Sequence, residues 1–138
     1  MIQLIIGEKG KGKTKILLEK ANTQIRTANG NIVYLDKNKQ HMYELNNRIR
    51  LIDVTTFPIE NTDNFIGFLC GLISRDNDLE MVYLDSFLKI AQIPEFDVST
   101  ALDKICFLSQ NYQVDFTISI SVTEEQLPER FREYVINA

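Results

Sequence analysis

Eight residues near the start of the chain have the types and spacing that hold a phosphate group. They fit the pattern G-x-x-x-x-G-K-[ST] of the phosphate-binding loop, or P-loop, and they are Gly7, Glu8, Lys9, Gly10, Lys11, Gly12, Lys13 and Thr14. Glycines let a backbone curl around an anion, so that successive N–H groups point at it. The helix expected to follow adds the partial positive charge of its N-terminus. The pattern predicts a site for nucleotide phosphates.

The polar side chains of this loop have expected roles. Lys13 should reach the β- and γ-phosphates and act in catalysis, and the Thr14 hydroxyl should bind the Mg²⁺ that bridges them. Glu8 could bend toward a phosphate partner, or it could be an ordinary solvated loop charge. Three further lysines either raise the affinity for anions or are ordinary surface lysines: Lys9, Lys11 and Lys15.

Asp85 ends the apolar segment MVYLD, residues 81–85. An apolar strand ending in aspartate is typical of the Walker B motif, whose carboxylate supports Mg²⁺. Together with the P-loop, this predicts a metal-supporting role for Asp85, and the alternative is that it caps a helix over residues 86–91. Many Walker B motifs continue with a glutamate that activates water, but Ser86 follows here, so that base is absent.

Other residues could assist hydrolysis. Asp36 ends the apolar segment NIVYLD, where RecA-like ATPases place a catalytic acid, and the alternative is a turn residue before Lys37. Ser121 and Thr123 follow the last apolar segment, where related folds place a polar sensor of the γ-phosphate, and turn or cap roles are the alternative. No arginine finger is evident, and the unplaced candidates are Arg48, Arg50 and Arg75.

The elements that must position these residues alternate along the chain. Apolar segments predict strands over residues 2–6, 31–36, 50–54, 81–85 and 114–122. Helical spacing and caps predict helices over residues 13–28, 63–74 (with Asp63 as cap), 86–91 and 100–110, and a closing helix from Pro128. This alternation predicts an α/β fold, a P-loop NTPase-like three-layer α/β/α sandwich with a mostly parallel five-stranded sheet. Ligands of such sheets bind beyond the carboxyl ends of the strands.

Two glycines and two cysteines lie in apolar segments. Gly67 and Gly71 are four residues apart in the helix expected over 63–74, which indicates close backbone packing against the sheet. Cys70 and Cys106 are expected to be small core residues. One histidine and no C-x-x-C pattern argue against a structural zinc site.

The chain has 138 residues, 44% hydrophobic and 25% charged, which predicts a single domain over residues 1–138. No apolar run reaches the roughly 20 residues that cross a bilayer, and charges follow the apolar residues 1–6 at once, unlike in a signal peptide. We therefore expect a cytoplasmic protein without a membrane partner.

The net charge of −4 is unevenly distributed. Residues 1–50 carry ten Lys/Arg and four Asp/Glu, whereas residues 51–138 carry five and fifteen. The local positive field favours an anionic ligand. A nucleoside triphosphate is favoured over nucleic acid, because the chain is acidic overall and has no basic stretch interleaved with aromatic residues.

The base is expected to be adenine by elimination. Guanine specificity usually appears as N-K-x-D, but Asn38-Lys39 is followed by Gln40-His41. The D-x-x-G of signalling GTPases is missing after Asp85. ATP and Mg²⁺ are therefore the expected ligands.

The sequence resembles the short, uncharacterised P-loop ATP-binding proteins of Clostridia-type Firmicutes, some of which are labelled as twitching-motility ATPases. The matching segments cover essentially the whole chain and include LIIGEKGKGKT (4–14), NGNIVYLD (29–36), RLIDV (50–54) and YLDSFLKI (83–90). Relatives tend to have Glu where this chain has Asp36. The resemblance implies a nucleotide-binding fold and a cytoplasmic location, and no known substrate.

Three functions remain open at this point. The first is an ATP-binding protein with slow Mg²⁺-dependent ATPase activity, in which a protein partner or a second copy could supply an arginine. The second is a nucleotide-dependent interaction or scaffold module without useful turnover, which the missing glutamate after Asp85 favours. The third is a small-molecule kinase, which the lack of an evident basic lid disfavours.

Overall fold

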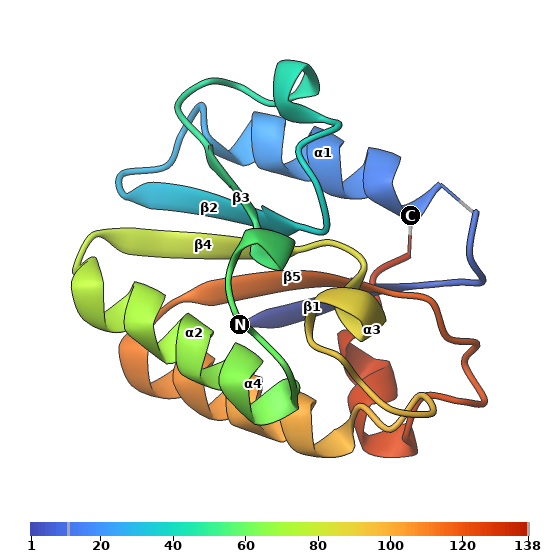
Figure 1. The fold of residues 1–138 in the computed structure, drawn as a ribbon. Coiled ribbons are helices and arrows are strands. Elements are labelled where there is room, and N and C mark those ends of the chain that lie inside the picture. Colours follow the sequence, from blue (N-terminus) through green and yellow to red (C-terminus); the bar gives the residue numbers. More distant parts are fainter. Residues whose placement is uncertain (11, 138) are drawn as a thin grey trace.

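The computed structural model describes residues 1–10 and 12–137, and in this part of the chain five strands form one sheet (Figure 1). All neighbouring strands are parallel, in the order β1-β5-β4-β2-β3. The strands are β1 (Ile2–Ile6), β2 (Asn31–Asp36), β3 (Arg50–Asp53), β4 (Leu79–Leu84) and β5 (Asp115–Ile120). The predicted α/β fold with a parallel five-stranded sheet is confirmed.

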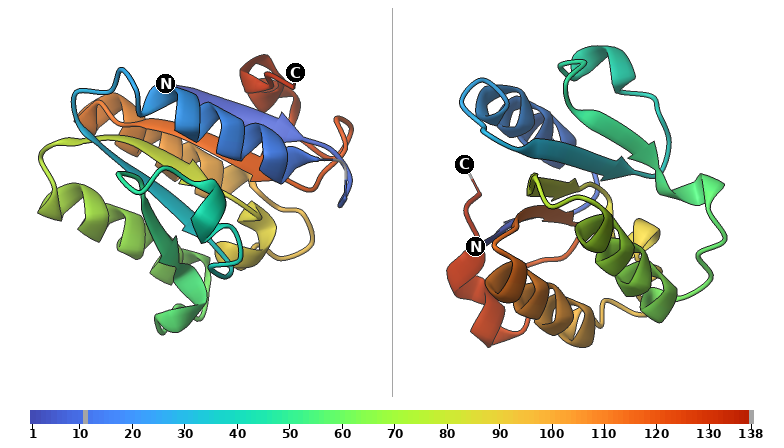
Figure 2. Two further views of the ribbon diagram at one scale, coloured as in Figure 1. Left: turned by 90° about the horizontal axis from the view of Figure 1, so that it is seen from above. Right: turned by 90° about the vertical axis from the view of Figure 1, so that its left-hand side faces the viewer.

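Helices cover both faces of this sheet. Figure 2 shows α1 on one face and α2 and α4 on the other, which makes three layers. The helices are α1 (Lys13–Gln24), α2 (Thr62–Arg75), α3 (Phe87–Ile90) and α4 (Ser99–Tyr112), and 3-10 helices span Met42–Glu44, Val54–Thr56 and Glu129–Tyr134. No helix in the described part of the chain is long and apolar enough to cross a membrane.

The sheet separates two hydrophobic cores. On the α1 face, Leu17 packs with Tyr34 and Tyr83. On the other face, Phe65 and Phe87 belong to a larger cluster built on α2, α3 and α4. Because both faces are covered, even Thr117 and Ser119, the polar residues in the interior of β5, are buried, as an inner strand of the sheet requires.

Several predicted boundaries shift. The first helix ends at Gln24, not at residue 28, because i→i+3 bonds such as Thr27 N–H to the Gln24 carbonyl tighten the chain into a turn. The cap of α2 is Asn61, which accepts from the Asn64 N–H at 2.8 Å, and Asp63 lies in the first turn. The closing helix after Pro128 is a 3-10 helix.

The glycines and cysteines of these helices do not all lie where the sequence indicated. Gly67 and Gly71 are exposed, and a β-carbon built on either would meet nothing within 4 Å, so the predicted close packing is wrong. Cys70 is also exposed and Cys106 is half-buried. Cys106 packs against the core, as expected, whereas Cys70 lies outside the buried stripe of α2, because a helix buries one stripe only.

The chain after Tyr134 pairs with the outer edge of β1. The Ile136 N–H donates to the Leu4 carbonyl at 2.9 Å. The Asn137 side chain then binds both backbone groups of Ile6, accepting from its N–H at 2.8 Å and donating to its carbonyl. This contact holds the last residue of β1 directly before the P-loop.

Candidate phosphate-binding site

The carboxyl ends of β1, β4 and β5 open into a pocket of about 510 Å³. Because β5 lies between β1 and β4, its end faces both the loop after β1 and Asp85 after β4. The residues that line the pocket are Lys9, Gly10, Gly12, Lys13, Thr14, Lys37, Asp85, Ser86, Leu88, Lys89, Ser119 and Ser121. This is the position at which parallel sheets bind ligands.

The backbone of the P-loop segment has the curvature that the glycine pattern predicts. Gly10 and Gly12 have φ of 84° and 80°, values that side chains with a β-carbon avoid. The Gly7 N–H donates to the Val122 carbonyl at 3.0 Å, which ties the start of the loop to the end of β5. Gly12 caps α1 without a side-chain bond, so no side chain competes with an anion for the first N–H groups of this helix. Lys11 lies outside the described residues.

Lys13 is largely buried, and its ammonium donates to the Glu8 carbonyl at 2.8 Å. Burial lowers the pKa of Lys13, while the nearby charge of Asp85 raises it. Glu8 therefore contacts this lysine through its backbone. A partly desolvated ammonium with one neutral acceptor gains more from an incoming anion than a solvated one.

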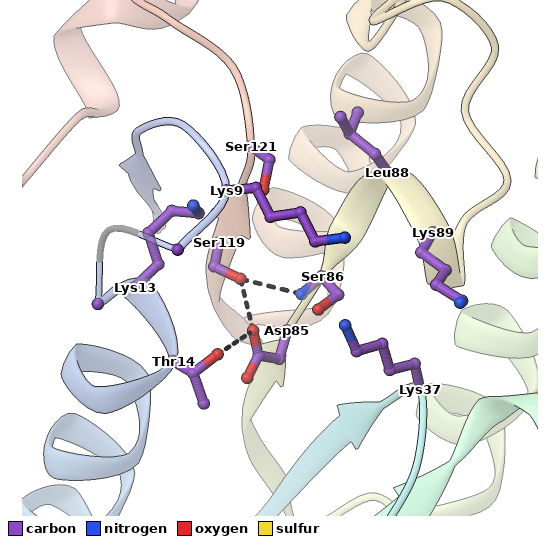
Figure 3. A pocket seen from close by; sticks show the side chains of 12 residues that line it. Lys9, Lys13, Thr14, Lys37, Asp85, Ser86, Leu88, Lys89, Ser119 and Ser121 are labelled. Carbon is purple, nitrogen blue, oxygen red and sulfur yellow. Dashed lines mark hydrogen bonds between the residues drawn. The ribbon is translucent and has the colours of Figure 1, made fainter.

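Asp85 is 2% exposed, and three hydroxyl groups donate to its carboxylate. Figure 3 shows the bonds from Thr14 and Ser119. Its Oδ1 accepts from Thr14 at 3.2 Å and from Ser119 at 2.8 Å, and its Oδ2 accepts from the Tyr34 phenol at 2.7 Å. Burial, together with the negative charge of Asp85, raises the pKa of Tyr34. The bond from Thr14 joins the P-loop to the end of β4, as the combined motifs predicted. The alternative, in which Asp85 caps the next helix, is wrong, because Ser86 occupies that position.

Ser86 has an unusual backbone beside this carboxylate. Its φ of 58° is uncommon for serine, and its N–H donates to Ser119 Oγ at 3.0 Å. Ser119 thus contacts both Asp85 and Ser86. Sequence analysis missed Ser119, although it lies on the same face of the strand as Ser121, two residues on. It also missed Tyr34, whose apolar surroundings indicated only a core residue.

Asp36 is buried but does not line the pocket. Its Oδ1 accepts from the Lys37 N–H at 2.7 Å. Burial, and then the charge of Asp85, raise the pKa of Asp36 to about 6. Asp36 is therefore influenced by the charge of Asp85, but its side chain is not part of the pocket lining.

The lining is strongly basic. Lys9 and Lys37 point toward Ser86 from opposite sides in Figure 3, whereas Lys89 extends from α3 away from Ser86. With Lys13 included, four described lysines and a single carboxylate, that of Asp85, line the pocket. Sequence analysis gave no role to Lys37 or Lys89, because only the fold brings them to the P-loop.

Other candidates lie elsewhere in the described part of the chain. Lys15 is exposed outside the pocket. Of the two expected sensors, Ser121 lines the pocket and Thr123 does not. The three arginines considered as fingers line a different hollow, at the opposite end of the strands: Arg48, Arg50 and Arg75.

The donor set fits a magnesium ion that is bound together with phosphates. The described residues contain no group of three or more His, Cys, Asp or Glu side chains that could hold a metal alone. Mg²⁺ is usually held by one or two protein oxygens, and phosphates and water complete its shell. Asp85 and the Thr14 hydroxyl, which lie in hydrogen-bond contact, supply such oxygens.

No known protein-family model matches the chain, and no curated protein matches it in sequence.

Proposed function

We propose that the protein binds ATP and Mg²⁺ at the P-loop pocket and hydrolyses ATP slowly. The observation that carries this proposal is the hydrogen bond from Thr14 to Asp85, which joins the two motifs within one basic pocket. A P-loop pattern alone could also be a flexible charged turn without a ligand. A P-loop in contact with a buried carboxylate after a parallel strand is a much more specific arrangement.

Each lining residue has a role in this proposal. The N–H groups of the loop and of the start of α1 bind phosphate oxygens. Lys13 exchanges the Glu8 carbonyl for the β- and γ-phosphates, and Thr14 and Asp85 hold Mg²⁺. Bound Mg²⁺ neutralises charge on the phosphates. Lys37 and Lys89 add positive charge on the open side of the pocket.

Slow turnover follows from the few groups that could activate water. Among the described lining residues, Asp85 is the only carboxylate, and its oxygens already accept three hydrogen bonds. Asp36 is the remaining candidate base, and it is buried and does not line the pocket. Without a base within reach of the attacking water, general-base catalysis contributes little.

The same observation favours a second candidate function, a nucleotide-dependent interaction module without useful turnover. In that case ATP binding alone changes the loop and the surface around it. The resemblance to short P-loop ATP-binding proteins stays a prediction, and so do the adenine preference and the cytoplasmic location.

Calorimetry with ATP, GTP and ADP, with and without Mg²⁺, tests the binding. We expect micromolar, Mg²⁺-dependent binding of ATP that weakens at least about tenfold in Lys13→Ala, because one charge-assisted contact is lost. Lys15→Ala is the matched control, since it removes an exposed lysine of the same loop region, outside the pocket. Equal loss in both variants, or no binding by the wild type, would contradict the proposal.

Phosphate release then separates the two candidate functions. Slow release that disappears in Lys13→Ala supports an ATPase, because this variant removes positive charge facing the developing phosphoryl negativity. Bound ATP that stays intact supports the interaction module. Release that is unchanged in Lys13→Ala would exclude the P-loop as the site of hydrolysis.

A further inference from the structure

A second hollow, of about 400 Å³, lies at the end of the sheet opposite to the P-loop pocket. It is built from the first residues of β2, β3 and β4 and from the last turn of α2. The two pockets share no lining residue. What binds here is therefore independent of the function proposed for the P-loop.

Three arginines line this hollow. Arg50 begins β3 and pairs with Val33 of β2, and Arg48 lies two residues before it. Arg75, the last residue of α2, approaches from the helix. Within residues 1–10 and 12–137, no ion pair includes any of these three arginines.

The one carboxylate of the hollow is already engaged. Asp76 Oδ2 accepts from the Asn31 side-chain amide at 2.8 Å, and its Oδ1 accepts from the Asp78 N–H at 2.9 Å. These bonds hold Asp76 against the backbone turn before β4. Three positive charges thus face one negative charge that has partners of its own, on a protein whose net charge is negative.

Apart from Asn31, the rest of the lining is apolar. Val33 and Leu79 are buried, and Leu72 is half-buried beside them. The hollow therefore combines an apolar floor with a cationic rim, and a bare inorganic ion would leave the floor without contacts. Small-molecule sites typically have this combination of apolar lining and a few convergent polar groups.

We propose that this hollow binds an organic phosphate, a small molecule with one phosphate group and an apolar portion. The guanidinium fork matches the oxygens of a phosphate and can bind them in pairs. An anion bound here also relieves the mutual repulsion of the three arginines. A concave site of this size, with its basic residues confined to one rim, suits a small ligand better than a nucleic acid backbone.

An NMR titration of the full chain, carrying Lys13→Ala to weaken the P-loop site, tests the proposal with three probes: phenyl phosphate, inorganic phosphate and phenol. We expect phenyl phosphate to shift the amide signals of residues 31–33 and 72–79 and to bind more tightly than either other probe. Equal affinity for inorganic phosphate would overturn the apolar part of the proposal, and equal affinity for phenol would overturn the anionic part.

Arginine variants in the same background locate the site. Arg50→Ala and Arg75→Ala should each weaken phenyl phosphate about tenfold, because each removes a charge-assisted contact. Arg26→Ala is the control, since it removes an exposed arginine after α1 that does not line the hollow. Shifts confined to residues 7–14, no shifts at all, or equal weakening in Arg26→Ala would overturn the proposal. Unchanged melting temperatures of the variants show that their fold is intact.

Discussion

At the scale of single residues, the phenol of Tyr34 stabilises a buried carboxylate. In Tyr34→Phe, Asp85 Oδ2 loses its donor inside the sheet, and a buried charged acceptor without a partner costs about 1–3 kcal/mol. We therefore expect this variant to lower the free energy of unfolding by that amount, measured by urea denaturation.

Tyr83→Phe is the matched control for this prediction. Tyr83 pairs with Tyr34 across the sheet, and the two rings stack with their centroids 6.0 Å apart. The Tyr83 hydroxyl contacts only the Met81 sulfur, at 4.0 Å, a weak acceptor. The control should cost less than about 1 kcal/mol, and equal losses in both variants would contradict the role given to Tyr34.

The Asp36 carboxyl should make stability depend on pH. Its pKa in the fold is about 6, raised by burial and then by Asp85, against about 3.9 in an unfolded chain. The protonated carboxyl contributes its whole stabilising free energy below pH 4. This contribution is lost as the pH rises through 6, because the folded state binds the proton more tightly than the unfolded chain does. Asp36→Asn keeps the acceptor for the Lys37 N–H and cannot ionise.

We expect Asp36→Asn to be about 1–2 kcal/mol more stable than the wild type at pH 8, with allowance for solvent screening. The difference should shrink toward pH 4, and urea denaturation at both pH values measures it. A constant difference would show that ionisation of Asp36 is not the cause. The variant also tests Asp36 as a base, since unchanged ATP turnover would rule it out.

At the scale of elements, two glycines should respond oppositely to the same substitution. Gly71→Ala places a methyl group into open space on α2, and alanine in a helix interior is about 0.5–1 kcal/mol more stable than glycine. In Gly30→Ala, the new β-carbon would lie 2.2 Å from the Asp78 carbonyl oxygen. That variant should be destabilised, because the turn before β2 must move. Thermal denaturation of both checks the signs, and a loss in Gly71→Ala would contradict the open space on α2.

The elements were predictable where a local pattern decides them. The limits of all five strands were predicted to within two residues at each end. They were predictable because a short apolar segment between polar turns is typical of a buried strand. The end of α1 and the 3-10 geometry after Pro128 were not, since hydrogen bonding at helix ends depends on neighbouring segments. The exposure of Gly71 depends on which stripe of α2 meets the sheet.

The residues of the candidate site also fall into two groups, those that a local motif marks and those that only the fold brings together. Lys13, Thr14 and Asp85 carry motifs with fixed spacing, so their convergence could be predicted from the sequence. Lys37 and Lys89 reach the pocket from β2 and α3, and nothing local marks them. Asp36 was expected to assist catalysis because it ends a strand, and this stays a prediction; in the structure it is buried and does not line the pocket.

At the scale of the whole molecule, ligand binding should stabilise the fold. A ligand at about 100 times its dissociation constant adds about 2.7 kcal/mol to the free energy of unfolding. For a chain of this length that raises the melting temperature by about 5–10 °C. Differential scanning calorimetry with Mg²⁺ and ATP should show this rise in the wild type and in Lys15→Ala. The same rise in Lys13→Ala would contradict binding at the P-loop.

The contact between Tyr34 and Asp85 also has an optical consequence. The chain has five tyrosines and no tryptophan, so tyrosine dominates its near-ultraviolet absorbance. Tyr34 donates its hydrogen bond to the carboxylate proposed to support the metal, and a cation drawn to that carboxylate weakens the bond and shifts the phenol absorption. The ultraviolet absorbance of Tyr34 is thus an intrinsic probe of metal binding at Asp85, and Tyr34→Phe would remove this signal.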